Sequence, residues 1–144
     1  MKKLVLLLAF IGLWVSCDVK RDGNSENLYW YVKEFTVTSD QWELVNGVNQ
    51  INSYYRHTIS IHQLDREIVK RGNIFCYMYV ENDIQTLLPY TVHYGEKDGS
   101  LDYLWTETYS AEFSFRTVTF YMNCSDFKTN NRPKTTTFRV VLNY

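Results

Sequence analysis

The chain has 144 residues, a formal net charge of −1 and an aromatic content of 17%, with 12 tyrosines. This length is enough for one domain with a hydrophobic core and too short for two ordinary domains. Because there is no basic surplus that would release counterions from phosphates, we expect no nucleic-acid partner.

The first residues have the pattern of a processing signal. Two lysines at residues 2–3 precede an apolar run at residues 4–15, which leads through Ser16 to Cys17. A helix that crosses a bilayer needs about 20 apolar residues, so this shorter run is typical of a signal segment. We therefore predict a signal peptide over residues 1–16.

The end of this run resembles the lipobox of bacterial lipoproteins, in which the cysteine is diacylated and the peptide before it is removed. The match lies in Val15, Ser16 and Cys17, while Trp14 departs from the Leu, Val or Ile that the family prefers. The resemblance implies that Cys17 carries lipid and holds the mature chain to a membrane. An ordinary secretory peptide, with Cys17 in a disulfide, is the alternative.

Residues 17–27 predict a flexible tether, because they are mostly polar or charged and lack the side chains that build a core. Removal of residues 1–16 takes Lys2 and Lys3 from the 15 basic residues and none of the 16 acidic ones, which shifts the formal net charge from −1 to −3. We expect the folded domain over residues 28–144.

A two-residue alternation of apolar and polar side chains predicts β-strands along most of this domain. It is clear at residues 35–38 and 54–61. The second of these strands places four side chains on one face: Tyr55, His57, Ile59 and Ile61. Residues 73–80 are apolar at both parities, which favours a central strand covered on both sides.

One short helix is predicted over residues 60–72. Ser60 and Gln63 have the spacing of a capping box, and Leu64 and Ile68 fall on one face. A glycine follows the basic last turn, and we expect the helix to end there.

The last part of the chain predicts a hairpin and a closing strand. The apolar parity flips between residues 111 and 122, which indicates a turn or bulge near residues 115–117. Residues 137–144 place four side chains on one face: Phe138, Val140, Leu142 and Tyr144. The expected fold is all-β, an antiparallel β-sandwich with one short helix, for which immunoglobulin-like is the nearest description. A small barrel is the alternative, because a strand pattern does not decide whether a sheet closes.

The order of patterned stretches is similar to that of a group of small, uncharacterised lipoproteins of Bacteroidota. The stretches are YVKEFTV, SDQWELVNG, LPYTVHY, VTFYMNCSDF and TFRVVL, and the resemblance covers roughly residues 28–144. The resemblance implies an outer-membrane lipoprotein. In this phylum charged residues directly after the cysteine, such as Asp18, are associated with export to the outer surface, whereas in some proteobacteria Asp18 would resemble an inner-membrane retention signal, so the sequence leaves both the periplasmic and the surface location open. The resemblance carries over no functional residue except Cys17.

No sequence pattern indicates catalysis or a cofactor. The three histidines at residues 57, 62 and 93 form no HxH or HExxH motif, and neither CxxC nor GxSxG is present. The acidic residues Asp98, Asp102 and Glu107 are interpreted as solvated loop charge; the alternative is a pair of carboxylates of the kind that serves a glycosidase. Cys76 and Cys124 share the parity of their strands' apolar residues, so they could form a disulfide or remain two buried thiols.

Aromatic residues near strand ends carry the most specific functional hypothesis. Flat rings stack on the apolar faces of sugars, although rings in strands are more often packed inside a protein. The candidate ligand-binding residues are Trp30, Trp42, Tyr54, Tyr103 and Trp105. We therefore expect a non-catalytic binding or interaction module, with a glycan or an envelope protein as partner.

A structural role is the other hypothesis. Lipid-processed β-sandwich subunits occur among the pilins of Bacteroidota, and a terminal edge strand at residues 137–144 could pair with another chain.

Overall fold

The computed structural model describes residues 29–99 and 101–144. The predicted signal peptide (1–16), the tether (17–27) and Cys17 lie outside these described residues. The strands are β1 (Trp30–Val37), β2 (Glu43–Val45), β3 (Tyr54–Ser60), β4 (Asn73–Glu81), β5 (Ile84–Leu87), β6 (Tyr90–Asp98), β7 (Leu101–Ser114), β8 (Thr117–Cys124) and β9 (Thr136–Asn143). A 3₁₀ turn, η2 (Ser39–Gln41), and a short helix, α2 (Arg66–Arg71), complete the described elements.

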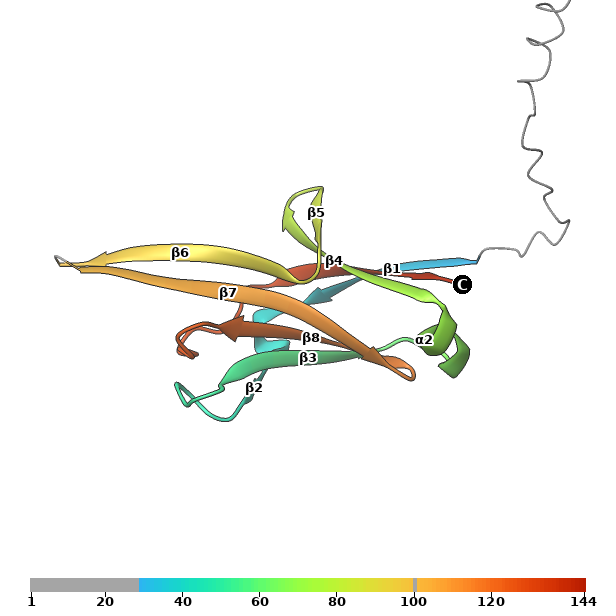
Figure 1. The fold of residues 1–144 in the computed structure, drawn as a ribbon, viewed down its shortest axis with the longest axis horizontal. Coiled ribbons are helices and arrows are strands. Elements are labelled where there is room, and N and C mark those ends of the chain that lie inside the picture. Colours follow the sequence, from blue (N-terminus) through green and yellow to red (C-terminus); the bar gives the residue numbers. More distant parts are fainter. Residues whose placement is uncertain (1–28, 100) are drawn as a thin grey trace, which may run out of the picture.

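These strands form two antiparallel sheets that lie face to face (Figure 1). The four-stranded sheet has the order β1-β9-β4-β5, and the five-stranded sheet has the order β2-β3-β8-β7-β6. The predicted antiparallel β-sandwich is confirmed. The barrel alternative is wrong for the described strands, because each sheet keeps two separate edge strands, whereas the immunoglobulin-like description is not confirmed.

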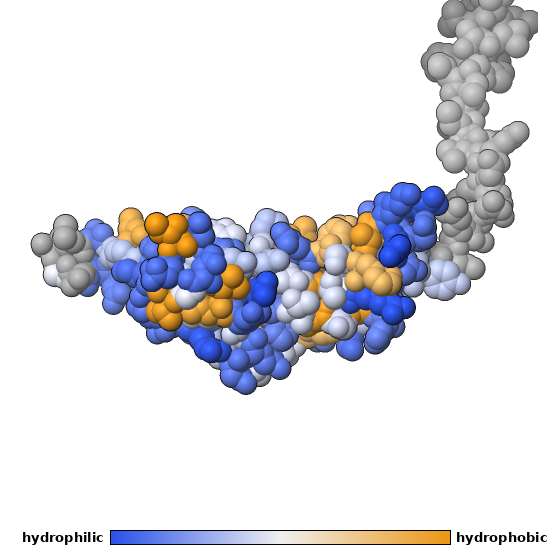
Figure 2. Space-filling view, turned by 90° about the horizontal axis from the view of Figure 1, so that it is seen from below, coloured by the Kyte–Doolittle hydropathy of each residue, from blue (hydrophilic) through white to orange (hydrophobic). Residues whose placement is uncertain are grey.

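The hairpin of β6 and β7 gives the domain its long axis. In Figure 1 it extends beyond the other strands at one end, while the start of β1, the C-terminus and α2 lie at the opposite end. Seen from the side of β2 and β3, hydrophobic side chains gather in separate areas towards these two ends, with mostly hydrophilic surface around them (Figure 2). The two ends of the domain therefore offer distinct surfaces.

Aromatic side chains from both sheets fill the core between them. The ring of Phe120 in β8 stacks on that of Phe138 in β9, with centroids 4.0 Å apart and an angle of 10°. Trp42, which follows η2, meets Phe138 edge-on at 6.1 Å. Phe120 and Phe138 are 0% exposed, so this stack joins the two sheets through their most deeply buried rings.

Strand β9 corrects the prediction of a terminal edge strand. Its residues pair with β1 on one side and with β4 on the other, so its backbone is not free for another chain. Phe138, Val140 and Leu142 face the core as predicted, while Tyr144 is 44% exposed and stacks on Tyr29.

The hairpin predicted near residues 115–117 is confirmed, because β7 ends at Ser114 and β8 begins at Thr117.

Strand β4 is covered on one face only, and not on both faces as expected. Cys76 and Met78 are buried on its inner side, but Phe75 on the outer side is 37% exposed. The outer face of β4 is itself apolar here, and no described element forms a third layer over it.

The helix is shorter than predicted and has a different cap. Ser60 is the last residue of β3, and the Asp65 carboxylate accepts the hydrogen bond of the Ile68 N–H at 2.8 Å. The prediction that Ser60 and Gln63 form the cap was wrong, because β3 continues through the serine. Leu64 and Ile68 are buried as expected.

Within the described ranges, no helix combines the length and the apolar character needed to cross a bilayer.

Replacement of Phe138 by alanine should destabilise the domain strongly. The change removes the ring that stacks on Phe120 and meets Trp42, and deletion of a buried phenylalanine side chain costs about 3–5 kcal/mol. Urea unfolding measures the effect. Phe113→Ala is the control, since Phe113 is 46% exposed and its loss should cost less than about 1 kcal/mol. Equal effects of the two variants would contradict this account of the core.

Candidate ligand-binding groove

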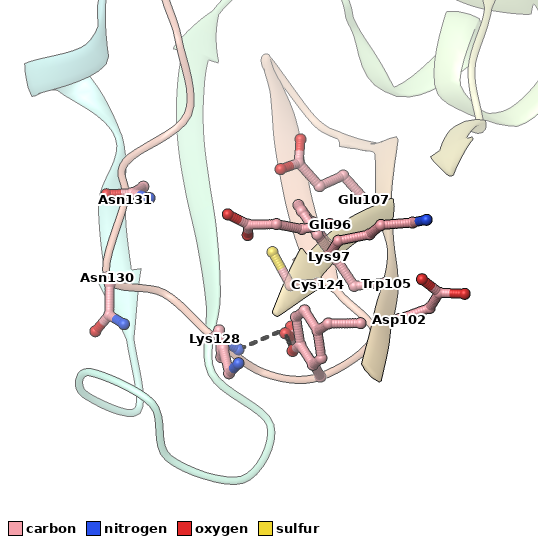
Figure 3. A pocket seen from close by; sticks show the side chains of 11 residues that line it. Glu96, Lys97, Asp102, Trp105, Glu107, Cys124, Lys128, Asn130 and Asn131 are labelled. Atoms are coloured by element: carbon pink, nitrogen blue, oxygen red, sulfur yellow. Dashed lines mark hydrogen bonds between the residues drawn. The ribbon is translucent and has the colours of Figure 1, made fainter. Parts of the chain in front are cut away.

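A groove of about 600 Å³ lies between the β6–β7 hairpin and the loop that follows β8 (Figure 3). Its walls combine aromatic rings, carboxylates, lysines and amides. The lining residues are Glu96, Lys97, Asp102, Tyr103, Trp105, Glu107, Cys124, Asp126, Lys128, Asn130 and Asn131. The groove therefore lies at the hairpin end of the sandwich.

The aromatic wall follows from the strand register of the hairpin. Tyr94 on β6 lies opposite Trp105 on β7, and Tyr103 precedes Trp105 by two residues on the same face. The rings of Tyr94 and Trp105 stack at 5.3 Å, and those of Trp105 and Tyr103 at 5.5 Å. Leu104 points to the other face and is 73% exposed. One face of the hairpin thus forms a continuous aromatic wall.

The loop after β8 is attached to this wall by hydrogen bonds. The Ser125 N–H donates to the carbonyl of Thr106 at 2.9 Å, and the Thr106 N–H donates to the Ser125 hydroxyl at 3.0 Å. Tyr103 donates its hydroxyl hydrogen to Asp126. The Lys128 ammonium lies 3.8 Å from the centre of the Tyr103 ring, and its hydrogen bond with Tyr103 raises the pKa of Lys128. These contacts fix the loop against the hairpin.

A second set of bonds holds the far side of the loop. The Thr129 N–H donates to the Asn49 side chain at 2.8 Å, and the Asn49 N–H donates to the Thr129 hydroxyl at 3.0 Å. The Tyr55 hydroxyl donates to the carbonyl of Thr129 at 2.7 Å, and Asn49 donates to Asn130 at 2.6 Å. Thr129 is 2% exposed, so the neighbouring amides of Asn130 and Asn131 are presented from a buried anchor.

The groove offers both donors and acceptors beside partly covered rings. Carboxylates accept hydrogen bonds, lysines donate them and asparagine amides do both, so the lining suits ligands rich in hydroxyl groups. Because the rings stack on one another and Lys128 covers part of Tyr103, they form a wall with partly open faces and not a flat platform.

Two of the acidic residues interpreted as loop charge line this groove, but on different sides of the hairpin. Asp102 and Glu107 have opposite parity on β7, and Figure 3 shows the carboxylate of Asp102 directed away from that of Glu107. The geometry therefore does not bring these two carboxylates together across a bond, as a glycosidase would need.

Only two of the five predicted ligand-binding aromatics come together. Tyr103 and Trp105 stack in the groove, whereas Trp30 is 61% exposed at the other end of the domain. Tyr54 packs on Tyr121 on the outer face of the five-stranded sheet. Trp42 is 1% exposed and belongs to the core, so the prediction that it contacts a ligand was wrong.

Sequence reasoning missed Tyr94, Asp126 and Lys128. The Asp-Gly pair at residues 98–99 is a hairpin signal, which would have indicated that Tyr94 lies across from the strand of Tyr103 and Trp105. The observed register pairs Asp98 with Leu101 and so sets Tyr94 opposite Trp105. Asp126 and Lys128 gave no such signal, because only the folded path of their loop brings them to Tyr103.

The two described cysteines are free and buried. Cys76 lies on β4 and Cys124 on β8, and of the two predicted alternatives the structure has the two buried thiols and not the disulfide. Burial raises the pKa of each thiol to about 11.

His57 is half-buried, and its Nδ1 lies 3.0 Å from the carbonyl oxygen of Gln41. In the described part of the chain, no three side chains of the metal-binding types gather as a site.

Comparisons with known proteins assign no function to the groove. No protein-family model, no curated protein and no solved structure matches the chain. The function of the groove is therefore inferred from its residues.

The buried thiols should make the domain less stable in alkali. Their pKa rises from about 9 to about 11 on burial, so above pH 9 the unfolded chain loses protons that the folded chain keeps. The free energy of unfolding should fall as the pH rises from 9 to 11. Urea titrations across this range measure the fall in the free energy of unfolding. The double variant Cys76→Ala, Cys124→Ala should show a smaller fall. A fall equal to that of the wild-type protein would contradict its attribution to the two thiols.

Proposed function

We propose that the chain is a lipid-anchored protein of the bacterial cell envelope that binds a glycan, without catalysis, in the groove beside the β6–β7 hairpin. One observation carries the ligand class: the rings of Tyr103 and Trp105 line an open groove of about 600 Å³ together with Asp126, Lys128 and Asn130. This combination of an apolar wall with a few placed polar groups is what small-ligand sites use.

A sugar matches both parts of this lining. Its hydroxyl groups would exchange hydrogen bonds with the carboxylates and amides of the groove, and its C–H faces would pack against the open parts of the rings. The loop that carries Asp126 and Asn130 is held from both sides, so little ordering is needed when a ligand enters.

The arrangement of the domain supports presentation of this groove away from a membrane. The start of β1, which follows the predicted tether, and the β6–β7 hairpin lie at opposite ends (Figure 1). With lipid on Cys17, as the lipobox resemblance implies, the groove would lie at the end farther from the anchor. An outer-membrane lipoprotein exposed at the cell surface would use this orientation to meet glycans outside the cell.

The alternative of a pilus-like component remains a prediction with less support. It depended on a free strand at residues 137–144, and β9 is paired on both sides.

Asp126→Asn should weaken glycan binding about tenfold. The change removes a charge that accepts hydrogen bonds in the groove, and a hydrogen bond to a charged group contributes about 1.5–3 kcal/mol. The measurement is retardation in gels that contain α-glucan, β-glucan, xylan or mannan. Glu112→Gln is the matched control, because Glu112 bonds to Tyr121 outside the groove and loses the same charge.

The tryptophans give a second matched pair for the same gels. Trp105→Ala should abolish retardation, and Trp30→Ala at the other end of the domain should leave it unchanged. Absence of retardation by every polysaccharide in the wild-type protein, or equal effects of the two tryptophan variants, would refute a glycan function for this groove.

Cys17→Ser should release the protein from membranes. Two acyl chains hold a protein durably, whereas the chain without lipid has no such anchor. Fractionation of cells into membrane and soluble parts measures the change, and the mass of the mature wild-type protein reports the acyl groups. Protease treatment of intact cells then tests exposure, since an internal domain would be protected until the outer membrane is opened.

A further inference from the structure

The outer face of the four-stranded sheet is divided into an apolar half and a polar half. The register aligns Val32 of β1, Val141 of β9 and Phe75 of β4 in one row across three strands. The inner side chains of β9 are its neighbours Val140 and Leu142, so this row points outwards. Trp30 lies on the same face, two residues before Val32.

The apolar half is exposed at its margins and closed at its centre. Trp30 is 61% exposed, Val32 47% and Phe75 37%. Val141, between Val32 and Phe75 in this row, is only 6% exposed although it points outwards. These four side chains form the apolar patch, a contiguous surface that no described element covers.

The polar half lies further along the same strands. Arg139 of β9 donates to Gln85 of β5 at 3.0 Å, and Gln85 donates to the hydroxyl of Tyr79 at 2.8 Å. Tyr79 in turn donates to Glu34 of β1. This network of polar side chains spans the four strands of the sheet and marks the boundary between the apolar half and the polar half of its outer face.

The position of the apolar patch limits what can cover it. Trp30 begins β1, at the end of the domain that follows the predicted tether, and Tyr29 is the twelfth residue after Cys17 in sequence. The segment from Cys17 to Tyr29 spans at most about 40 Å when fully extended. Lipid on Cys17 would therefore keep the start of β1 within about 40 Å of a bilayer surface.

The chemistry of this end fits a lipid interface better than a second copy of the chain. Trp and Tyr favour the boundary between hydrocarbon and water, and the exposed Tyr29 and Tyr144 stack beside the start of β1. A stable protein interface uses about 20–30 residues on each side, far more than the four of the apolar patch.

We propose that the apolar patch rests in the interface of the membrane that carries the lipid anchor. The inference depends on the proposed lipid at Cys17, which brings the patch to the bilayer. Strand β5 rises above the plane of β1, β9 and β4 in Figure 1, so the sheet cannot lie flat and only its apolar end makes contact. The domain is thus tilted, with the β6–β7 hairpin directed away from the lipid.

Lipid-quenched fluorescence tests this contact. The purified lipidated protein is placed in vesicles of phosphatidylcholine and phosphatidylglycerol whose acyl chains carry bromine, and tryptophan emission is recorded. Bromine quenching should fall by at least half in Trp30→Phe and remain in Trp105→Phe. Val32→Glu should also lower it, whereas Leu104→Glu, at an exposed site on the hairpin, should not.

Equal quenching in Trp30→Phe and Trp105→Phe would overturn the proposal. Flotation of the vesicles separately reports the anchor. If the protein does not float, the lipid on Cys17 is absent and the proposed location fails; the same quenching is then measured with Cys17 coupled to a maleimide lipid, which tests the apolar patch alone. A Cys17→Ser protein that sediments as a dimer, and as a monomer with Val32→Glu in addition, would assign the patch to a second copy and also overturn the proposal.

Discussion

The contact between Phe120 and Phe138 is the constraint on which the rest of the structure depends. Each ring belongs to a different sheet, and both strands lie inside their sheets with neighbours on either side. Because the stack fixes the distance and angle between the layers, it also fixes where β7 leaves the sandwich. The hairpin, the groove and the loop after β8 all take their places relative to this buried pair.

The sequence was informative where one rule acts locally. Alternation along residues 54–61 and 138–142, the parity flip near residue 116 and the shared face of Leu64 and Ile68 were all predicted correctly, since side-chain period alone decides them. Tyr144 was not, because β9 ends one residue before it. The helix cap was not, because Ser60 satisfies both the strand pattern and the cap pattern, and β3 pairing with β8 decides in favour of the strand.

The sequence predicted the aromatic residues of the groove but not its charged residues. Tyr103 and Trp105 were selected as candidates and do stack in the groove, but the same aromatic criterion also selected Trp42, which packs on Phe138. An aromatic residue type does not say whether a ring is inside or outside. That distinction comes from the path of the chain, which also brings Asp126 and Lys128 to Tyr103 across a separation that no local pattern records.

The central place of β9 has a consequence for the order of assembly. The four-stranded sheet has residues 136–143 between β1 and β4, so β1 has no partner in this sheet until nearly all of the described chain has been synthesised. Long-range strand pairing of this kind is slow to form. The four-stranded sheet of the described domain therefore cannot be completed before its last strand has been made, so the sandwich closes late in synthesis.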